Sequence, residues 1–224
     1  MNSINHRLDA LLSCNKVLVM AHRGMAGANI VDNTIESYEV ALRGGADMLE
    51  MDVCSSIDGE LFVMHDGTEQ MMFGIDRNVT TMTAAEIRRL RYMNKNRTPI
   101  EHAPHTLDEV LDYLKGRCIL NLDRCWDHWE LVLPAVRRHG MEDQVLLKSP
   151  VKEKYLDFLA SQDVKYMYMP FINEPEELDK VRAREINMVA VQIDSYNEGD
   201  AAMEPDFLHG LEREGMCRAI CVMT

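Results

Sequence analysis

Three short apolar segments near the N-terminus, each with polar or charged residues at or near its C-terminal end, limit the folds that this chain can adopt. They cover residues 16–21, 48–53 and 61–66. Between the first two lies a helix-type segment, in which Ile35, Tyr38 and Leu42 form an apolar stripe. A strand, a helix and a second strand in this order make a βαβ unit, which implies a parallel sheet.

The same alternation of strands and helices continues through the rest of the chain. Further strands are expected at residues 118–123, 144–148, 165–171, 188–194 and 217–223. Helices are expected at residues 5–13, 83–92, 106–116, 127–139, 149–161, 174–184 and 205–214. This order predicts the α/β class and a TIM (β/α)₈-type barrel, with the site at the carboxyl ends of the strands. We expect one domain, residues 1–224.

Local signals predict where two of the helices begin and where the barrel is irregular. Asn33, followed three residues later by Glu36, is typical of a capping box, and Ser149 before Pro150 is typical of a helix start. The connection at residues 54–60 is too short for a crossover helix between parallel strands. We therefore expect the barrel to be irregular between its second and third strands.

Composition excludes some classes of partner. The formal net charge is -13 at pH 7, so the chain lacks the basic surface that nucleic acids require. No apolar segment is long enough to cross a bilayer, and residues 1–13 do not have the pattern of a signal peptide. The 6 cysteines contain no CxxC pair, which favours buried thiols in a reducing cytoplasm. We expect a cytoplasmic protein with a small-molecule partner.

Glu50 and Asp52 are the strongest candidates for a metal site. A strand has a period of two, so both carboxylates point to the same side of residues 48–53. They repel each other there, and their desolvation is costly, so a bound cation is the simplest compensation. Oxygen ligands suit Mg²⁺, Ca²⁺ or Mn²⁺ better than Zn²⁺. The alternative, an exposed polar face, fits poorly because parallel sheets are buried on both sides.

His22, Arg23 and His65 follow the first and third apolar segments. Imidazole titrates near neutrality, so two histidines that flank a pair of carboxylates suit general acid and base catalysis. Arg23 offers a planar fork suited to phosphate oxygens. The alternative for Arg23 is a salt bridge to a nearby carboxylate such as Asp66, and the two roles are compatible.

A series of short motifs with consistent order and spacing carries a family resemblance. The motifs are His22-Arg23-Gly24, Asp32-Asn33-Thr34, Gly45-Ala46-Asp47, Glu50-Met51-Asp52, Ser56-Ile57-Asp58-Gly59 and His65-Asp66. Together they resemble the glycerophosphodiester phosphodiesterase family. The resemblance implies a TIM barrel that hydrolyses glycerophosphodiesters to glycerol 3-phosphate and an alcohol with a divalent cation. It also implies that His22 and His65 are the catalytic acid and base.

The resemblance extends to the strand at residues 118–123 but departs from the family pattern there. The family carries Glu-x-Lys at this point, which implies Asp123 as the third metal ligand and sets Cys125 in place of the lysine. By strand parity, Arg124 points to the opposite face. Lys148, at the end of the next strand, is the candidate for the missing phosphate-binding cation. The alternative for Lys148 is a lysine extended along an apolar rim.

Two alternatives to this function stay open. The departures at Asp32, Asp123 and Cys125 favour a non-catalytic or regulatory binding module on the same barrel. The presence of both His22 and His65 argues against it, because a binding module has little use for them. The other alternative is a phosphodiesterase for a different headgroup.

The resemblance also bears on the end of the sequence. In the family, the chain continues beyond a strand like residues 217–223 with a further helix and strand, whereas this sequence stops at Thr224. The expected barrel is therefore incomplete at its C-terminal end. We expect either closure through residues 217–223 or pairing of the open edge with a second copy, which would make a homo-oligomer.

Overall fold

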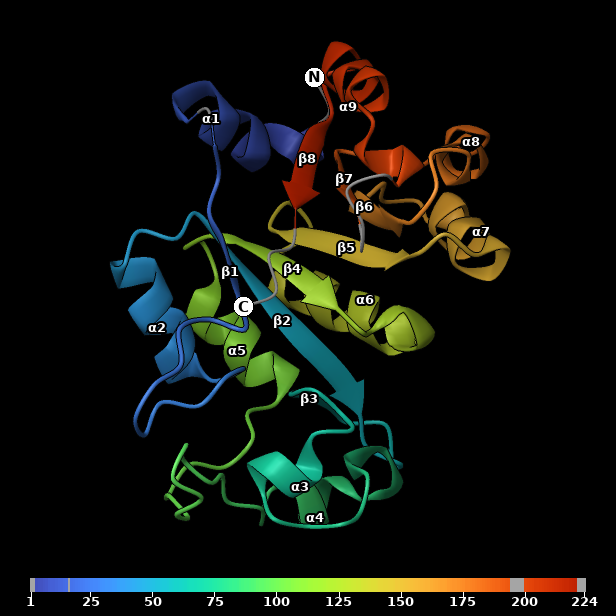
Figure 1. Ribbon diagram of the computed structural model, residues 1–224. Helices are drawn as coiled ribbons and strands as arrows, with labels where there is room; N and C mark the ends of the chain where they lie inside the picture. Colours follow the sequence, from blue (N-terminus) through green and yellow to red (C-terminus); the bar gives the residue numbers. More distant parts are fainter. Residues whose placement is uncertain (1–2, 16, 194–199, 221–224) are drawn as a thin grey trace. The chain divides into compact units, whose positions relative to one another are not determined.

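The computed structural model describes residues 3–15, 17–193 and 200–220 (Figure 1). The chain divides into two compact units, Met1–Val145 and Leu146–Thr224. The expectation of a single domain over residues 1–224 stays a prediction. No helix among the described residues is both long enough and apolar enough to cross a membrane.

The first unit is organised around three parallel strands. Its strands are β1 (Met20–His22), β2 (Met48–Ser55), β3 (Leu61–Val63) and β4 (Ile119–Asp123). Strand β2 pairs in parallel with β1 on one side and with β4 on the other. Every residue of β2 is buried, as expected for a central parallel strand.

Strand β3 confirms the expected irregularity. It pairs antiparallel with β2, with Ser55 opposite Leu61, so a hairpin replaces the crossover helix. The turn is closed by two backbone hydrogen bonds, from Ser56 N to Glu60 O and from Gly59 N to Ser56 O. A connection of this length permits a hairpin and not a parallel crossover.

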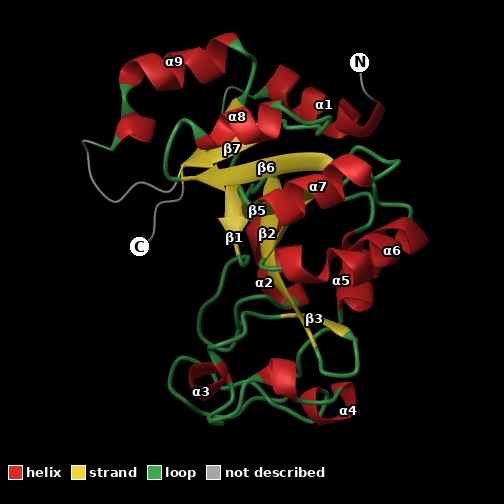
Figure 2. Cartoon of the chain, turned by 90° about the vertical axis from the view of Figure 1, so that its right-hand side faces the viewer, coloured by secondary structure: helices red, strands yellow, loops and turns green. Residues whose placement is uncertain are grey.

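Helices surround the strands of the first unit. They are α1 (His6–Cys14), α2 (Ile35–Arg43), α3 (Glu69–Met72), α4 (Ala84–Ile87), α5 (Leu107–Leu114) and α6 (Trp129–His139), with 3₁₀ turns at Ser3–Asn5, Val79–Thr81 and Trp126–His128. Helices α3 and α4 lie beyond β3, away from β1 and β4 (Figure 1 and Figure 2). Phe62, Met64, Phe73, Ile87 and Tyr92 form part of a separate apolar core there. This core anchors the loop that follows β3.

The second unit repeats the strand–helix alternation. Its elements are β5 (Val145–Pro150), α7 (Glu153–Ser161), β6 (Met167–Ile172), α8 (Glu177–Arg182), β7 (Ala190–Ile193), the 3₁₀ turn Ala201–Met203, α9 (Pro205–Arg213) and β8 (Cys217–Ile220). Strands β5 to β8 pair in parallel in chain order. The parallel α/β class is therefore as predicted. The expected closure through residues 217–223 stays a prediction, and residues 221–224 lie outside the described residues.

Several element boundaries differ from expectation. The expected strand at residues 16–21 is reduced to β1, since Val17 and Val19 are 77% and 55% exposed and Lys16 is outside the described residues. Strand β7 begins at Ala190, after the start expected for the strand at residues 188–194, and Asp194 lies outside the described residues. Helix α7 begins at Glu153, because β5 continues to Pro150 and the Ser149 hydroxyl bonds with Tyr168 Oη at 2.9 Å.

Candidate active site

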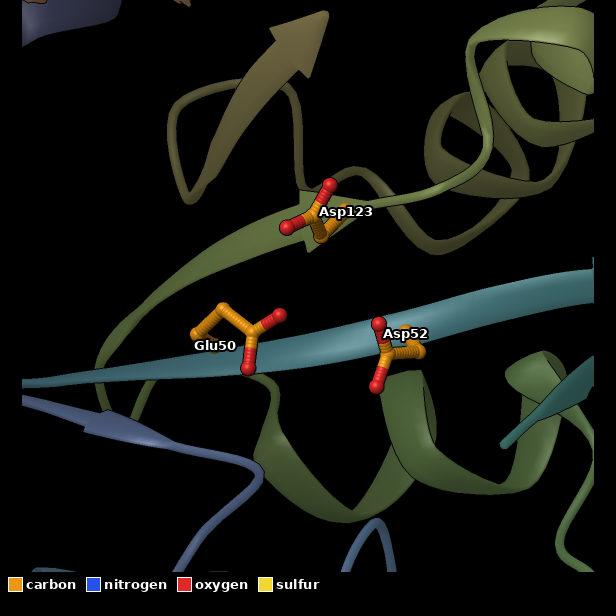
Figure 3. A group of neighbouring side chains, drawn as sticks. All are labelled: Glu50, Asp52 and Asp123. Atoms are coloured by element: carbon orange, nitrogen blue, oxygen red, sulfur yellow. The ribbon is translucent and has the colours of Figure 1, made fainter. Parts of the chain in front are cut away.

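The neighbouring strands β2 and β4 bring three carboxylates together (Figure 3). The register pairs Asp52 with Asp123 across these strands, and Glu50 lies two residues before Asp52 on the same face. One carboxylate oxygen from each of the three residues lies within 4.8 Å of the other two. Glu50 and Asp52 are 4% and 1% exposed. The three expected ligands are thus close enough to share one cation.

Asp52 is held by a contact that the sequence did not predict. Asn33 Nδ2 donates to Asp52 Oδ2 at 2.8 Å, and Arg23 Nε lies 2.9 Å from the same oxygen. The arginine contact is an ion pair without hydrogen-bond alignment. Because both groups use Oδ2, they fix the orientation of the Asp52 carboxylate. Asn33 is therefore not the helix cap that its position suggested.

Helix α2 begins one residue later than predicted. Thr34 is the N-cap: its Oγ1 accepts from Ser37 N, and Ser37 Oγ accepts from Thr34 N, both at 3.2 Å. This arrangement frees Asn33, which has a left-handed φ of 58°, to face β2. Glu36 has no part in the capping box. In this motif, therefore, Asn33 contacts the candidate site and Thr34 caps the helix.

Arg23 and His22 lie against Glu50. The backbone N–H of Arg23 donates both to the Glu50 carbonyl oxygen at 3.1 Å and to Glu50 Oε2 at 2.9 Å. His22 Nε2 is 3.9 Å from the same Oε2, and its side chain is 58% exposed. The exposed imidazole is accessible to a substrate while it touches a candidate ligand. Arg23 thus makes the salt bridge to a nearby carboxylate that was its alternative role, and the carboxylate is that of Asp52 and not the example given, Asp66.

His65 lies in the loop after β3. The backbone N–H of Met64 donates to the Asp52 carbonyl oxygen at 3.0 Å, which sets this loop at the carboxyl end of β2. His65 Nδ1 is 2.6 Å from the carbonyl oxygen of Asp66. A carbonyl oxygen only accepts, so Nδ1 carries the proton in this contact. Nε2 of the neutral ring is then a proton acceptor.

Arg124 occupies a place that strand parity excluded. Strand β4 ends at Asp123, and Arg124 takes a left-handed φ of 56°. Its Nε and Nη2 lie 3.1 Å and 3.0 Å from Asp66 Oδ1. Parity applies only inside a strand, so the prediction that Arg124 points away from the site is wrong. Cys125, by contrast, is fully buried, and its burial raises the pKa of the thiol.

Asn121 is a second residue that sequence reasoning missed. It pairs in register with Glu50 and lies two residues before Asp123, so it shares the face of the carboxylates. Its side chain is fully buried, and neither Oδ1 nor Nδ2 has a hydrogen-bond partner within the described part of the chain. A buried amide of this kind normally binds water or a ligand.

Lys148 belongs to β5 in the second unit. It is 9% exposed, and its Nζ lies 5.6 Å from the centroid of the Phe171 ring, within cation–π range. This contact resembles the apolar-rim alternative considered for this lysine. Its expected role toward phosphate stays a prediction.

Comparison with known proteins assigns the chain to a family. The model of the glycerophosphoryl diester phosphodiesterase family matches residues 22–203. The chain belongs to this family. The matched region includes the carboxylate cluster, both candidate histidines and Arg124, and the predicted resemblance is confirmed.

The alignments of this chain with curated members of the family cover only part of each of those proteins. The glycerophosphodiester phosphodiesterase of Bacillus subtilis (strain 168) is 46% identical over 56 residues, which are 25% of this chain and 19% of that protein. The enzyme of Bacillus altitudinis is 38% identical over an alignment of 148 residues that covers 58% of this chain and 57% of that protein. This chain therefore spans less than two thirds of these relatives.

Solved structures of family members share the fold. A glycerophosphoryl diester phosphodiesterase from Parabacteroides distasonis has a TM-score of 0.80 at 18% identity, covering 95% of this chain and 76% of that chain. A phosphodiesterase from Oleispira antarctica, solved with the product sn-glycerol-3-phosphate, has a TM-score of 0.73 at 16% identity, covering 93% and 85%. These likenesses confirm the predicted TIM-barrel fold class.

Proposed function

We propose that this chain is a divalent-cation-dependent phosphodiesterase that hydrolyses glycerophosphodiesters to glycerol 3-phosphate and an alcohol. The observation that carries the proposal is the convergence of the Glu50, Asp52 and Asp123 carboxylates within 4.8 Å. Family membership supports the reaction class, and the relative from Oleispira antarctica, solved with sn-glycerol-3-phosphate, supports the product.

The donor set fits a hard divalent cation. Glu50, Asp52 and Asp123 offer only oxygen ligands, as Mg²⁺, Ca²⁺ and Mn²⁺ prefer. The Asn121 amide lies on the same face, has no hydrogen-bond partner among the described residues, and suits the waters that such ions retain. When bound, the cation supplies positive charge that stabilises the phosphoryl oxygens in the transition state. Asn33 and the ion pair from Arg23 keep Asp52 oriented for it.

The two histidines move protons in this proposal. His65, held through Nδ1 by the Asp66 carbonyl oxygen, offers Nε2 to the reacting groups. His22, exposed beside Glu50, offers a second imidazole. One histidine takes the proton of the nucleophile, which is either water or the neighbouring glycerol hydroxyl. In the second case the first product is a cyclic phosphate, which water then opens to glycerol 3-phosphate. The other histidine protonates the leaving alcohol as its bond to phosphorus breaks. Arg23 binds the phosphate oxygens.

Turnover of glycerophosphocholine with Mg²⁺, Ca²⁺ or Mn²⁺, with and without a chelator, tests the proposal. We expect activity that the chelator abolishes, and a loss of kcat on the order of 10²-fold or more in His22→Ala and in His65→Ala. Wild-type activity in His65→Ala would remove this residue from the mechanism. Metal binding without turnover of any glycerophosphodiester would instead favour the binding module. Turnover of only other diesters would favour a different headgroup.

A further inference from the structure

Arg124 touches two parts of the candidate site that the fold brings in separately. Its backbone N–H donates to Asp123 Oδ1 at 2.7 Å, so it orients a candidate metal ligand at the end of β4. Its guanidinium binds Asp66 Oδ1 through both Nε and Nη2. Asp66 lies in the loop after β3, 58 residues before Arg124 in the sequence. One residue therefore connects the end of β4 with that loop.

The backbone conformation of Arg124 makes this double contact feasible. A non-glycine residue with a φ of 56° is uncommon and is retained only when its surroundings stabilise it. The turn directs the Arg124 N–H back to the preceding side chain while the guanidinium extends toward Asp66. The left-handed conformation is thus tied to contacts on both sides of the site.

Asp66 links Arg124 to His65 through two hydrogen bonds. The Asp66 carboxylate accepts from Arg124, and the Asp66 carbonyl oxygen accepts from His65 Nδ1 at 2.6 Å. We propose that Arg124 is a positioning residue: it holds Asp66, and through Asp66 the His65 ring, in a fixed relation to the Asp123 carboxylate. Its effect on turnover rests on the proposed function, whereas its effect on the His65 ring does not.

The balance of charge in the candidate site also favours an arginine at position 124. Asp66 adds a fourth carboxylate to those of Glu50, Asp52 and Asp123. The guanidinium groups of Arg23 and Arg124 pair with two of the four. Without Arg124, Asp66 loses the guanidinium that pairs with it. The site is then more negative by the charge of one arginine and repels an anionic phosphodiester more strongly.

A double-mutant cycle tests the connection. We expect Arg124→Gln and Asp66→Asn each to lower kcat for glycerophosphocholine by about tenfold or more, the scale of a small displacement of a catalytic group. The double variant should lose little more than the worse single variant, because both changes break one contact. Arg124→Lys should recover part of the loss. Arg77→Gln, which breaks a pair with Glu86 on the surface, is the matched control and should keep wild-type kcat.

Two kinetic results would overturn the proposal. Effects of Arg124→Gln and Asp66→Asn that multiply in the double variant would show independent roles. In the other result, Asp66→Asn keeps wild-type kinetics while Arg124→Gln has a higher KM. This would indicate that Arg124 binds the phosphate directly.

An NMR measurement separates this proposal from the proposed function. Long-range correlations between ring protons and nitrogens report which nitrogen of His65 carries the proton. We expect the Nδ1–H form of the neutral His65 ring in the wild type and its loss in Arg124→Gln. His139, held by Asp108 and Asp112 at 2.8 Å and 2.9 Å, is the internal control and should not change. An unchanged His65 spectrum in Arg124→Gln would reject the positioning role, even if the chain hydrolyses no diester.

Discussion

Asn33 and Asp52 make a paired contact: Asn33 Nδ2 donates to Asp52 Oδ2 at 2.8 Å, and Asn33 Oδ1 accepts from the Asp52 backbone N–H at 3.1 Å. Tyr38 Oη donates to the same Asn33 Oδ1 at 3.0 Å. All three residues are buried. Burial raises the pKa of Tyr38 well above its usual value, and the charges of Glu50 and Asp52 raise it further. Tyr38 therefore stays protonated and keeps donating, so the contact persists at every physiological pH.

Removal of the Asn33 amide is expected to destabilise the fold. Asn33→Gly tolerates the left-handed φ but leaves Asp52 N–H and Tyr38 Oη without their acceptor, which costs about 1–3 kcal/mol. Asn33→Ala adds the strain of a Cβ in that conformation, a further cost of about 1 kcal/mol. Urea denaturation measures both free energies of unfolding. Equal stability of Asn33→Gly and the wild type would contradict the role given to the amide.

Asp123 is expected to contribute to cation affinity although it is less buried than Glu50 and Asp52. Removal of its charge in Asp123→Asn takes away one of the three candidate ligands. We expect Mn²⁺ affinity to fall by at least about 10-fold to 100-fold, the scale known for residues that only support ligands. Calorimetric titration measures this loss. Glu130→Gln on α6 is the control for the loss of one negative charge, and wild-type affinity in Asp123→Asn would remove this residue from the ligand set.

The carboxylate cluster was predictable because it depends on a local rule. The two-residue period of a strand places Glu50 and Asp52 on one face wherever β2 lies, and the register then brings Asp123 beside Asp52. Arg124 and Asn33 were not predictable in this way. Both adopt a left-handed φ without being glycine, and only the surrounding contacts stabilise that conformation. Residues of this kind leave no periodic signal in the sequence.

In the fold, too, local sequence patterns were sufficient for some features, whereas others depend on contacts between residues far apart in the sequence. The apolar pattern at residues 61–66 predicted a strand, and the short connection before it predicted an irregular corner, but neither gave its direction. At the start of α2, Asn33 and Thr34 are both good capping residues by composition. The contact of Asn33 with buried Asp52 decides in favour of Thr34, and that contact joins residues 19 positions apart.

Gly24 is expected to be intolerant of substitution. It has a φ of 81°, and a Cβ placed there would lie 2.7 Å and 2.8 Å from the backbone C and O of Ser37 in α2. Gly24→Ala therefore forces the loop after β1 away from α2, which displaces His22 and Arg23. We expect a lower melting temperature together with weaker cation binding. Gly27→Ala, where nothing lies within 4 Å, is the matched control. Equal melting temperatures for the two variants would contradict the close packing on Ser37.

Glu39 connects α2 to α5 through charged contacts. Its Oε2 accepts from Arg117 Nη2 at 2.6 Å and from Tyr113 Oη at 2.8 Å, and its Oε1 accepts from Arg43 Nε at 2.7 Å. The hydrogen bond from Arg117, followed by those from Tyr113 and Arg43, lowers the pKa of Glu39 to about 2. The unfolded chain has an ordinary glutamate pKa of about 4.3. Folding therefore favours the ionised form of this side chain.

The difference between these two pKa values predicts how Glu39 affects stability with pH. Its contribution is complete above the unfolded pKa and is lost as the pH falls from about 4.5 to about 2, because protonation breaks contacts that only the folded state has. Glu39→Gln does not titrate, so the difference in melting temperature from the wild type should be constant above about pH 5 and shrink below it. High salt should reduce the difference, because the contacts are exposed. Thermal unfolding of both proteins between about pH 7 and about pH 2.5 measures it, and a difference that stays constant over this range would refute the role of ionised Glu39.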